Sequence, residues 1–224
     1  MANHMRVTLE LGPRGKKAVV VAADWPGLSR GAATEAAALE RLRAYLPRYV
    51  PVARLAGMED AFAAATDLAV IERYPGTGST DFWGISFAFS GHDTQAMSRD
   101  ALERELALLR ACWRWFDAVR SRVSAELRRG PRGGGRDREQ IVRHTLAAER
   151  DWARKLGLRP SEEDLRTDEG VRSHREAYCE AIRALHAEGR PARTWPLRFL
   201  IRHTAFHTLD HAWEMEDKDL TARA

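Results

Sequence analysis

The sequence predicts an α+β protein, with a small N-terminal α/β module followed by a C-terminal up-and-down four-helix bundle. Short runs rich in Val, Ile and Phe occur before residue 92, and only helical periodicity follows them. The 224 residues are 44% hydrophobic and 30% charged, which is ordinary for a globular protein with one large core or two modest ones. We therefore expect an α/β module over residues 1–91 and a helical bundle over residues 92–224.

The N-terminal part contains four apolar runs that are bounded by Gly, Pro and Asp and read as strands. Residues 13–15 and 75–79 have the composition of turns, and each lies between two of these runs, which predicts two β-hairpins. The predicted strands are residues 5–11, 18–23, 68–74 and 82–89.

One helix is predicted within the N-terminal module, over residues 35–46. Thr34 is a suitable N-cap residue, and Pro47 and Pro51 are expected to end the helix.

The C-terminal part predicts four helices with intervening loops, which suits a bundle with or without one long crossover. Ser98 is a plausible N-cap for the first helix, and the segment rich in Gly and Arg after residue 128 is expected to be a flexible loop. Gly and Pro residues mark the later boundaries. The predicted helices are residues 98–128, 137–156, 168–187 and 196–218.

The last predicted helix carries His207 and His211, four residues apart. Residues with this spacing are separated by only about 40° around an α-helix, so the two imidazoles lie side by side and can bind one cation. His203 continues the same stripe. The alternative is a pair of surface or hydrogen-bonded histidines without a metal.

An open metal site needs a third protein ligand in addition to water. His144 shares an apolar stripe of the second predicted helix with Ile141 and Trp152, so it is expected to point inward. His174 is the rival candidate, but its charged neighbours suggest a solvated helix start. We prefer His144 as the third ligand.

Three carboxylates lie close to these histidines in the sequence. Asp210 and Glu214 either orient an imidazole from behind or are simply exposed charges. Glu149 lies about 140° around its helix from His144, which argues against a role as catalytic base.

These residues carry a family resemblance. The sequence Ile-Val-Arg-His-Thr-Leu-Ala-Ala-Glu-Arg-Asp-Trp around His144, and the run His-Thr-Ala-Phe-His-Thr-Leu-Asp-His that ends at His211, resemble the helix-two and helix-four motifs of the DinB-like superfamily of metal-binding four-helix bundles. The resemblance implies that His144, His207 and His211 bind a divalent metal ion, Zn, Ni or Fe, with water completing the coordination. The common His-Arg-Gly-Gln continuation is replaced here by His-Ala-Trp-Glu.

The DinB-like resemblance also implies a class of reaction. The superfamily includes transferases and isomerases that use a metal-bound low-molecular-weight thiol, together with members of unknown activity. A metal held by three neutral imidazoles lowers the pKa of a bound water or thiol. We therefore expect a metal-dependent transferase or hydrolase that acts on a small-molecule substrate.

A shorter stretch, residues 19–39, resembles the HicB-like antitoxin pattern, in which a strand leads into a Pro-Gly turn and then into a helix. This resemblance implies a small binding or dimerising α/β module. The matching residues are Pro26, Gly27, Gly31, Thr34, Glu35 and Leu39.

Composition limits the partners and the compartment. The net charge of +4 is spread along the chain, so it gives no reason to expect a nucleic-acid partner. Cys112 and Cys179 form no CxxC pair, which favours a reducing cytoplasm. No apolar stretch has the length of a membrane span. We expect a cytoplasmic homodimer without a membrane partner.

Two other classes of function compete with an enzyme. One is a non-catalytic metal-binding or dimerising stress-response module, and the other is an antitoxin-like partner protein that is led by the N-terminal module. A site closed by a fourth ligand would favour the first of these, because catalysis needs an exchangeable position.

Overall fold

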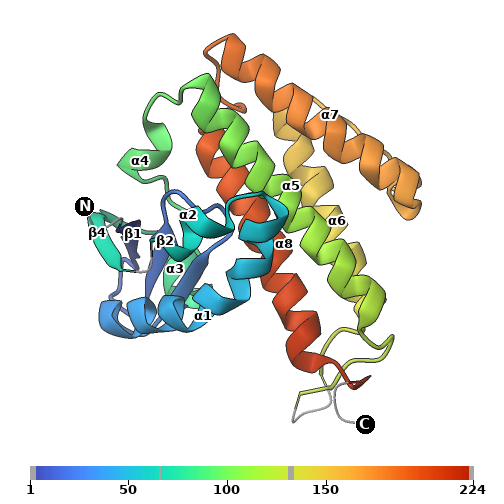
Figure 1. Cartoon of the computed structure of the whole chain (residues 1–224), viewed down its shortest axis with the longest axis horizontal. Helices are drawn as coiled ribbons and strands as arrows, with labels where there is room; N and C mark the ends of the chain where they lie inside the picture. The colour runs from blue at the N-terminus through green and yellow to red at the C-terminus, as the bar shows by residue number, and fades with distance from the viewer. Residues whose placement is uncertain (1–3, 66, 131–133, 222–224) are drawn as a thin grey trace.

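The computed structural model describes residues 4–65, 67–130 and 134–221, and it is a mixed α and β structure, as the sequence predicts. A four-stranded sheet lies at one side and the long C-terminal helices lie at the other (Figure 1). The sheet has the order β3-β2-β1-β4, in which β1 pairs parallel with β4 and the other pairs are antiparallel. The strands are β1 (Met5–Leu11), β2 (Ala18–Ala22), β3 (Ser29–Ala32) and β4 (Leu68–Pro75).

The first hairpin forms as predicted, and β2 is the central buried strand of its module. Every residue of β2 is buried, which explains its continuous run of Ala and Val. β3 was not predicted, because Ser-Arg-Gly-Ala has no alternation of apolar and polar residues. It joins the sheet through antiparallel pairing with β2.

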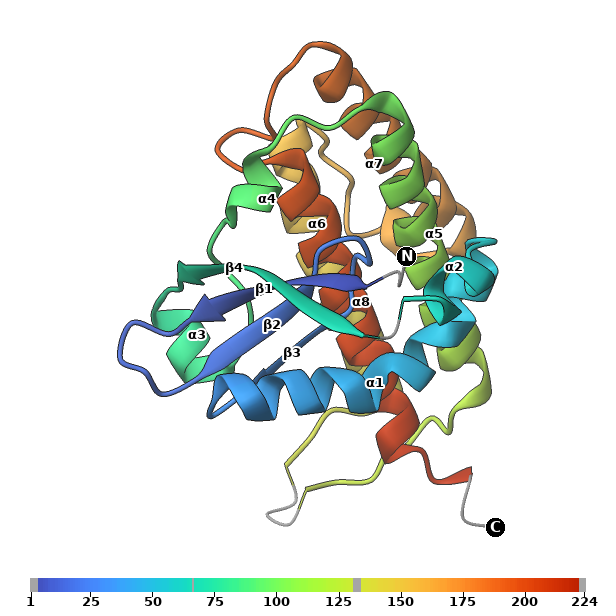
Figure 2. The same ribbon diagram turned by 60° about the vertical axis from the view of Figure 1, so that its left-hand side comes forward.

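Helix α1 (Glu35–Leu55) begins at the predicted N-cap Thr34, whose side chain accepts a hydrogen bond from Ala37 N at 3.2 Å. The helix runs beneath the sheet in Figure 2 and contacts β2 and β3. The prediction that Pro47 and Pro51 end it was wrong, because both lie inside the helix. The buried side chains of its last turns, among them Tyr49, bind these turns to the core and offset the backbone hydrogen bonds that proline cannot donate.

The predicted strand over residues 82–89 does not form, and neither does the second hairpin. Helix α3 (Gly78–Trp83) includes its first residues, and Gly84 ends that helix in the left-handed region with φ of 71°. The rest of the segment is held by side chains instead of a β-ladder: the buried Glu10 carboxylate accepts hydrogen bonds from Ser86 Oγ at 2.6 Å and from Phe87 N at 3.2 Å. The Phe residues of the apolar run that suggested a strand are partly exposed.

The helices predicted after residue 92 form with small differences. Helix α5 ends at Arg122, earlier than predicted, because Val123 is in an extended conformation. Ser98, Asp137 and Thr167 cap three of the helices through their side chains. The remaining elements are α2 (Glu59–Ala63), α4 (Gly91–Thr94), α5 (Arg99–Arg122), α6 (Arg138–Ala153), η1 (Arg154–Leu156), η2 (Asp164–Arg166), α7 (Asp168–Ala187) and α8 (Leu197–Lys218).

Helix α8 is the element that joins the two parts of the fold. It contacts α5 and α6, and its other side contacts the sheet module at Gly27, in the loop between β2 and β3. Gly27 has φ of +94°, and a Cβ atom there would lie 2.8 Å from Leu209 Cδ1. The main hydrophobic core accordingly contains residues from the sheet module, such as Leu28, together with residues of α5 and α8.

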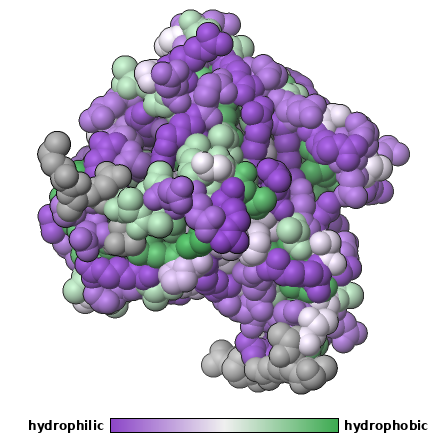
Figure 3. Space-filling model, in the orientation of Figure 1, coloured by the Kyte–Doolittle hydropathy of each residue, from purple (hydrophilic) through white to green (hydrophobic). Residues whose placement is uncertain are grey.

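The outer surface is mixed. The face in Figure 3 is mostly hydrophilic, with hydrophobic areas between the polar ones. Among the residues that the structure describes, no helix has both the length and the apolar character needed to span a membrane.

Candidate metal centre

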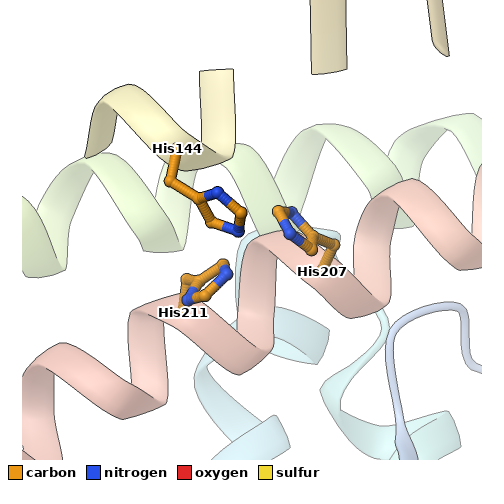
Figure 4. Close-up of side chains that lie close together, drawn as sticks. All are labelled: His144, His207 and His211. Atoms are coloured by element: carbon orange, nitrogen blue, oxygen red, sulfur yellow. The ribbon is translucent and has the colours of Figure 1, made fainter. Parts of the chain in front are cut away.

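The three histidines that the sequence selects come together between α6 and α8. His144 projects from α6, and His207 and His211 project from α8 toward it (Figure 4). The ring centroids of His144 lie 5.1 Å from those of His207 and 4.9 Å from those of His211, and the two rings on α8 are 4.5 Å apart. One ligand nitrogen from each residue lies within 4.8 Å of the other two.

This spacing suits a single metal ion after a small adjustment of the side chains. Zinc binds histidine nitrogen at about 2.0–2.1 Å, so two ligands of a tetrahedral site are about 3.4 Å apart. The histidine nitrogens would approach one another by up to about 1.4 Å, which a change of imidazole torsion angles can supply. His207 Nδ1 is buried and has no hydrogen-bond partner among the described residues, so a ligand would satisfy it.

The surroundings of His144 and His207 favour neutral imidazoles. Burial and, to a smaller extent, the neighbouring histidines together lower the pKa of His207 to about 2. Burial also lowers the pKa of His144, and the charge of His211 acts in the same direction. Metal binding requires deprotonated ring nitrogens, so the environment supplies the correct protonation state without competition from bound protons.

Glu214 lies behind the cluster and fixes one of its rings. His211 Nδ1 donates a hydrogen bond to Glu214 Oε2 at 2.8 Å, and this bond lowers the pKa of Glu214 to about 2. With Nδ1 engaged, the Nε2 atom of His211 is the nitrogen left for a ligand. Of the two carboxylates that the sequence offered, Glu214 therefore contacts a cluster histidine, while Asp210 contacts Arg30 Nη1 at 3.2 Å.

Aromatic rings close one side of the cluster. The Trp152 ring lies 5.2 Å from that of His207 and 4.9 Å from that of His203, and Phe87 packs on the other side of His203 at 4.7 Å. His203 is fully buried and stacks on Phe199, and burial lowers its pKa to about 3. It belongs to an aromatic layer beside the three-histidine group.

The rival ligand His174 lies elsewhere, and the expectation that it is solvated was wrong. Its side chain is 3% exposed, and Nε2 lies 3.4 Å from Glu149 Oε1. Arg175 also contacts Glu149, with 3.3 Å between Nε and Oε1. The charged neighbours of His174 in the sequence suggested exposure to solvent. In the structure, this face of α7 packs against α6 instead.

Sequence reasoning missed Phe87 and Arg30. Phe87 contacts His203 because Glu10, 77 positions earlier in the chain, accepts a hydrogen bond from its backbone. Arg30 lies in a strand that has no apolar pattern, and its contacts with α8 bridge 180 positions of the sequence. Neither residue has a local sequence signal, since long-range contacts determine where each side chain lies.

Comparisons of the chain with protein-family models, with curated proteins and with solved structures found no match. The geometry of the histidine cluster and the sequence motifs around it are therefore the features that indicate a function.

Proposed function

We propose that this chain is a metal-dependent enzyme, a transferase or hydrolase, that holds one divalent ion of Zn, Ni or Fe on His144, His207 and His211. The observation that supports the proposal most strongly is the convergence of three ligand nitrogens within 4.8 Å from two different helices. Within the described ranges, no fourth His, Cys, Asp or Glu belongs to this group. Three protein ligands leave a coordination position for water or substrate, as catalysis requires.

A divalent ion on three neutral imidazoles would lower the pKa of a bound water or thiol, which gives a nucleophile at neutral pH. The surrounding residues have separate parts in this proposal. Glu214 holds the ring of His211 in one orientation through the 2.8 Å hydrogen bond. Trp152 and His203 keep bulk water from one side of the cluster. A low-molecular-weight thiol is the proposed cosubstrate.

The positions of the three histidines on their helices also support a proposal about the family of this chain. We propose that α5, α6, α7 and α8 form a DinB-like four-helix bundle, because His144 lies on the second of these helices and His207 and His211 on the fourth. The HicB-like resemblance of the N-terminal module is likewise a proposal. It is supported by the Pro26-Gly27 turn between β2 and β3 and by Thr34 at the start of α1.

Metal content tests the proposed function. The protein is stripped with a chelator, dialysed against Zn²⁺, Ni²⁺ or Fe²⁺ in turn, and analysed for bound metal by mass spectrometry. We expect one ion per chain and a loss of at least tenfold in metal affinity in the variants His144→Ala and His207→Ala. The matched control is His186→Ala, since His186 contacts Met97 O and lies outside the cluster.

The outcome that contradicts the proposal is equally concrete. If His207→Ala keeps one tightly bound ion while its fold is unchanged by circular dichroism, the ion is held elsewhere. A Co²⁺-substituted protein adds a direct reading of the site, because its visible spectrum distinguishes tetrahedral from octahedral coordination.

A further inference from the structure

A cavity lies between α8 and the sheet module. Its volume is about 360 Å³, which is at the lower end of the range for small-molecule sites. β3, the segment that follows α3, and α8 form its walls. Its lining includes three basic side chains, one acidic side chain and two aromatic side chains: Lys17, Arg30, Arg41, Asp210, Trp83 and Phe206.

The polar half of this cavity has an excess of positive charge. Lys17 Nζ donates to Phe82 O at 2.7 Å, and Arg41 Nη1 donates to Gly31 O at 2.9 Å. Both acceptors are neutral carbonyl groups, so these bonds leave the two charges uncompensated. Asp210 is the single acidic residue that lines the cavity.

Arg30 gives the clearest sign of a missing ligand. Its side chain is 4% exposed, and its guanidinium lies between the rings of Tyr45 at 3.7 Å and Trp213 at 4.4 Å. Nε and Nη2 are buried without a hydrogen-bond partner among the described residues. Burial lowers the pKa of Arg30 to about 10, since it disfavours the charged form.

The protein compensates this buried charge only in part. Asp210 is the ion-pair partner of Arg30, but its own side chain is 51% exposed, and solvent weakens such a pair. Ser29 Oγ, which also lines the cavity, is buried without a partner in the described part of the chain. Buried donors without acceptors are unfavourable, and an anion in the cavity would offset the buried charge of Arg30, although Nε, Nη2 and Ser29 Oγ do not themselves reach the cavity surface.

The other half of the cavity is apolar and has a fixed shape. Trp83 is 66% exposed, and Phe206 lies across from the sheet module on α8. The backbones of Gly31 and Gly84 approach so closely that a Cβ atom on Gly31 would lie 2.2 Å from Gly84 O. The two glycines therefore hold the Trp83 segment against β3 at a distance that larger residues would not permit.

We propose that this cavity binds a small organic acid, with its carboxylate at Arg30 and Arg41 and its apolar part against Trp83 and Phe206. The positive charge of Lys17, Arg30 and Arg41 selects the anion, and the exposed aromatic surface of Trp83 selects an apolar group attached to it.

The cavity is also close to the histidine cluster along α8. Phe206 and Asp210 directly precede His207 and His211 in the sequence, so each pair of neighbours is about 100° apart around the helix. The cavity and the histidine cluster therefore face different sides of α8. Binding of the acid does not depend on the proposed metal ion.

Calorimetric titration with 3-phenylpropionate tests the proposal, with 3-phenylpropionamide as the uncharged probe of the same shape. We expect the acid to bind at least tenfold more tightly than the amide, and we expect Lys17→Gln and Arg41→Gln to reduce the affinity for the acid several-fold. Arg48→Gln is the matched control. Arg48 lies over the same two rings as Arg30, but it pairs with Glu216 and Asp217 and does not line the cavity.

Equal affinity for acid and amide would overturn the proposal, and so would unchanged affinity in both Lys17→Gln and Arg41→Gln. These two residues are more exposed than Arg30, so their replacement leaves the buried core intact. The titration is carried out on metal-free and on metal-loaded protein. Acid binding by a protein that takes up no metal contradicts the proposed function alone, and metal uptake by a protein that does not bind the acid contradicts only this inference.

Discussion

Glu214 lies one turn after His211 on α8 and accepts a hydrogen bond from its Nδ1 atom at 2.8 Å. Lys218, one turn further on, donates to the other carboxylate oxygen of Glu214. The three side chains form a chain of contacts along the helix surface that ends at the histidine cluster. The orientation of His211 is therefore determined before any ligand arrives.

Replacement of Glu214 tests this relationship. We expect Glu214→Ala to reduce metal affinity about 10- to 100-fold, because the imidazole loses the partner that fixes its orientation. Competition with a chromogenic chelator measures the change. Asp210→Asn is the control, since Asp210 contacts Arg30 instead of a histidine. An equal loss of affinity in both variants would mean that net charge, and not orientation, controls metal binding.

The lowered pKa of His203 predicts that the free energy of unfolding decreases in mild acid. This pKa is about 3 in the folded protein and about 6.5 in the unfolded chain, so the unfolded state binds more protons below pH 6.5. The contribution of His203 is therefore complete above pH 6.5 and is lost as the pH falls toward 3. In His203→Phe we expect the free energy of unfolding to decline less steeply, by up to about 1.4 kcal/mol per pH unit over this interval.

Urea unfolding at pH 7, 5.5 and 4 measures these slopes. A constant difference between the two proteins at all three pH values would contradict the prediction, because it would show only the lost packing of His203. His144 is present in both proteins and its lowered pKa does not depend on His203, so its contribution cancels in the comparison.

The contact of Gly27 with α8 predicts a large effect of a single methyl group. Gly27→Ala places a Cβ atom 2.8 Å from Leu209 Cδ1 at φ of +94°, so strain and overlap act together. We expect it to lower the free energy of unfolding by about 2 to 4 kcal/mol. Gly15→Ala is the matched control: it has φ of +63° and nothing within 4 Å, so about 1 kcal/mol is expected. Equal losses would mean that conformation alone matters at Gly27.

Replacement of Glu10 is expected to destabilise the segment after α3. Its buried carboxylate accepts hydrogen bonds from Tyr74 Oη, Ser86 Oγ and Phe87 N, and Glu10→Ala leaves these donors unpaired. We expect a loss of about 3 kcal/mol or more in stability and faster cleavage by chymotrypsin after Phe87. The exposed Glu139→Ala is the control. Unchanged cleavage at Phe87 would mean that the segment does not depend on Glu10.

The sequence predicts the periodic elements of this fold well and the irregular ones poorly. Helices α6 and α7 carry clear periodicity and capping residues, and the ends of α6, α7 and α8 lie close to the predicted positions. Pro47 misled the interpretation, because burial of Tyr49 outweighs the local cost of proline. The apolar, Phe-rich run around Phe87 indicated a strand, although hydrogen bonds to the distant Glu10 hold that segment in place.

The same distinction applies to the candidate site. The helical spacing of His207 and His211 and the stripe of His144 contain the information that brings the three rings together. Glu214 could be selected as a candidate from its position three residues after His211, but the sequence did not separate it from Asp210. Arg30 could not be selected at all, since its neighbours Tyr45 and Trp213 come from two other elements of the fold.

The shared core has a mechanical consequence for α8. One side of this helix carries His207 and His211, and Leu209 on another side contacts Gly27 of the sheet module. A rotation of the helix by a few degrees would move the imidazoles and press Leu209 into the loop at Gly27. The contact between Leu209 and Gly27 thus restricts rotation of α8. The spacing of the histidines therefore depends on residues of the sheet module that do not contact them.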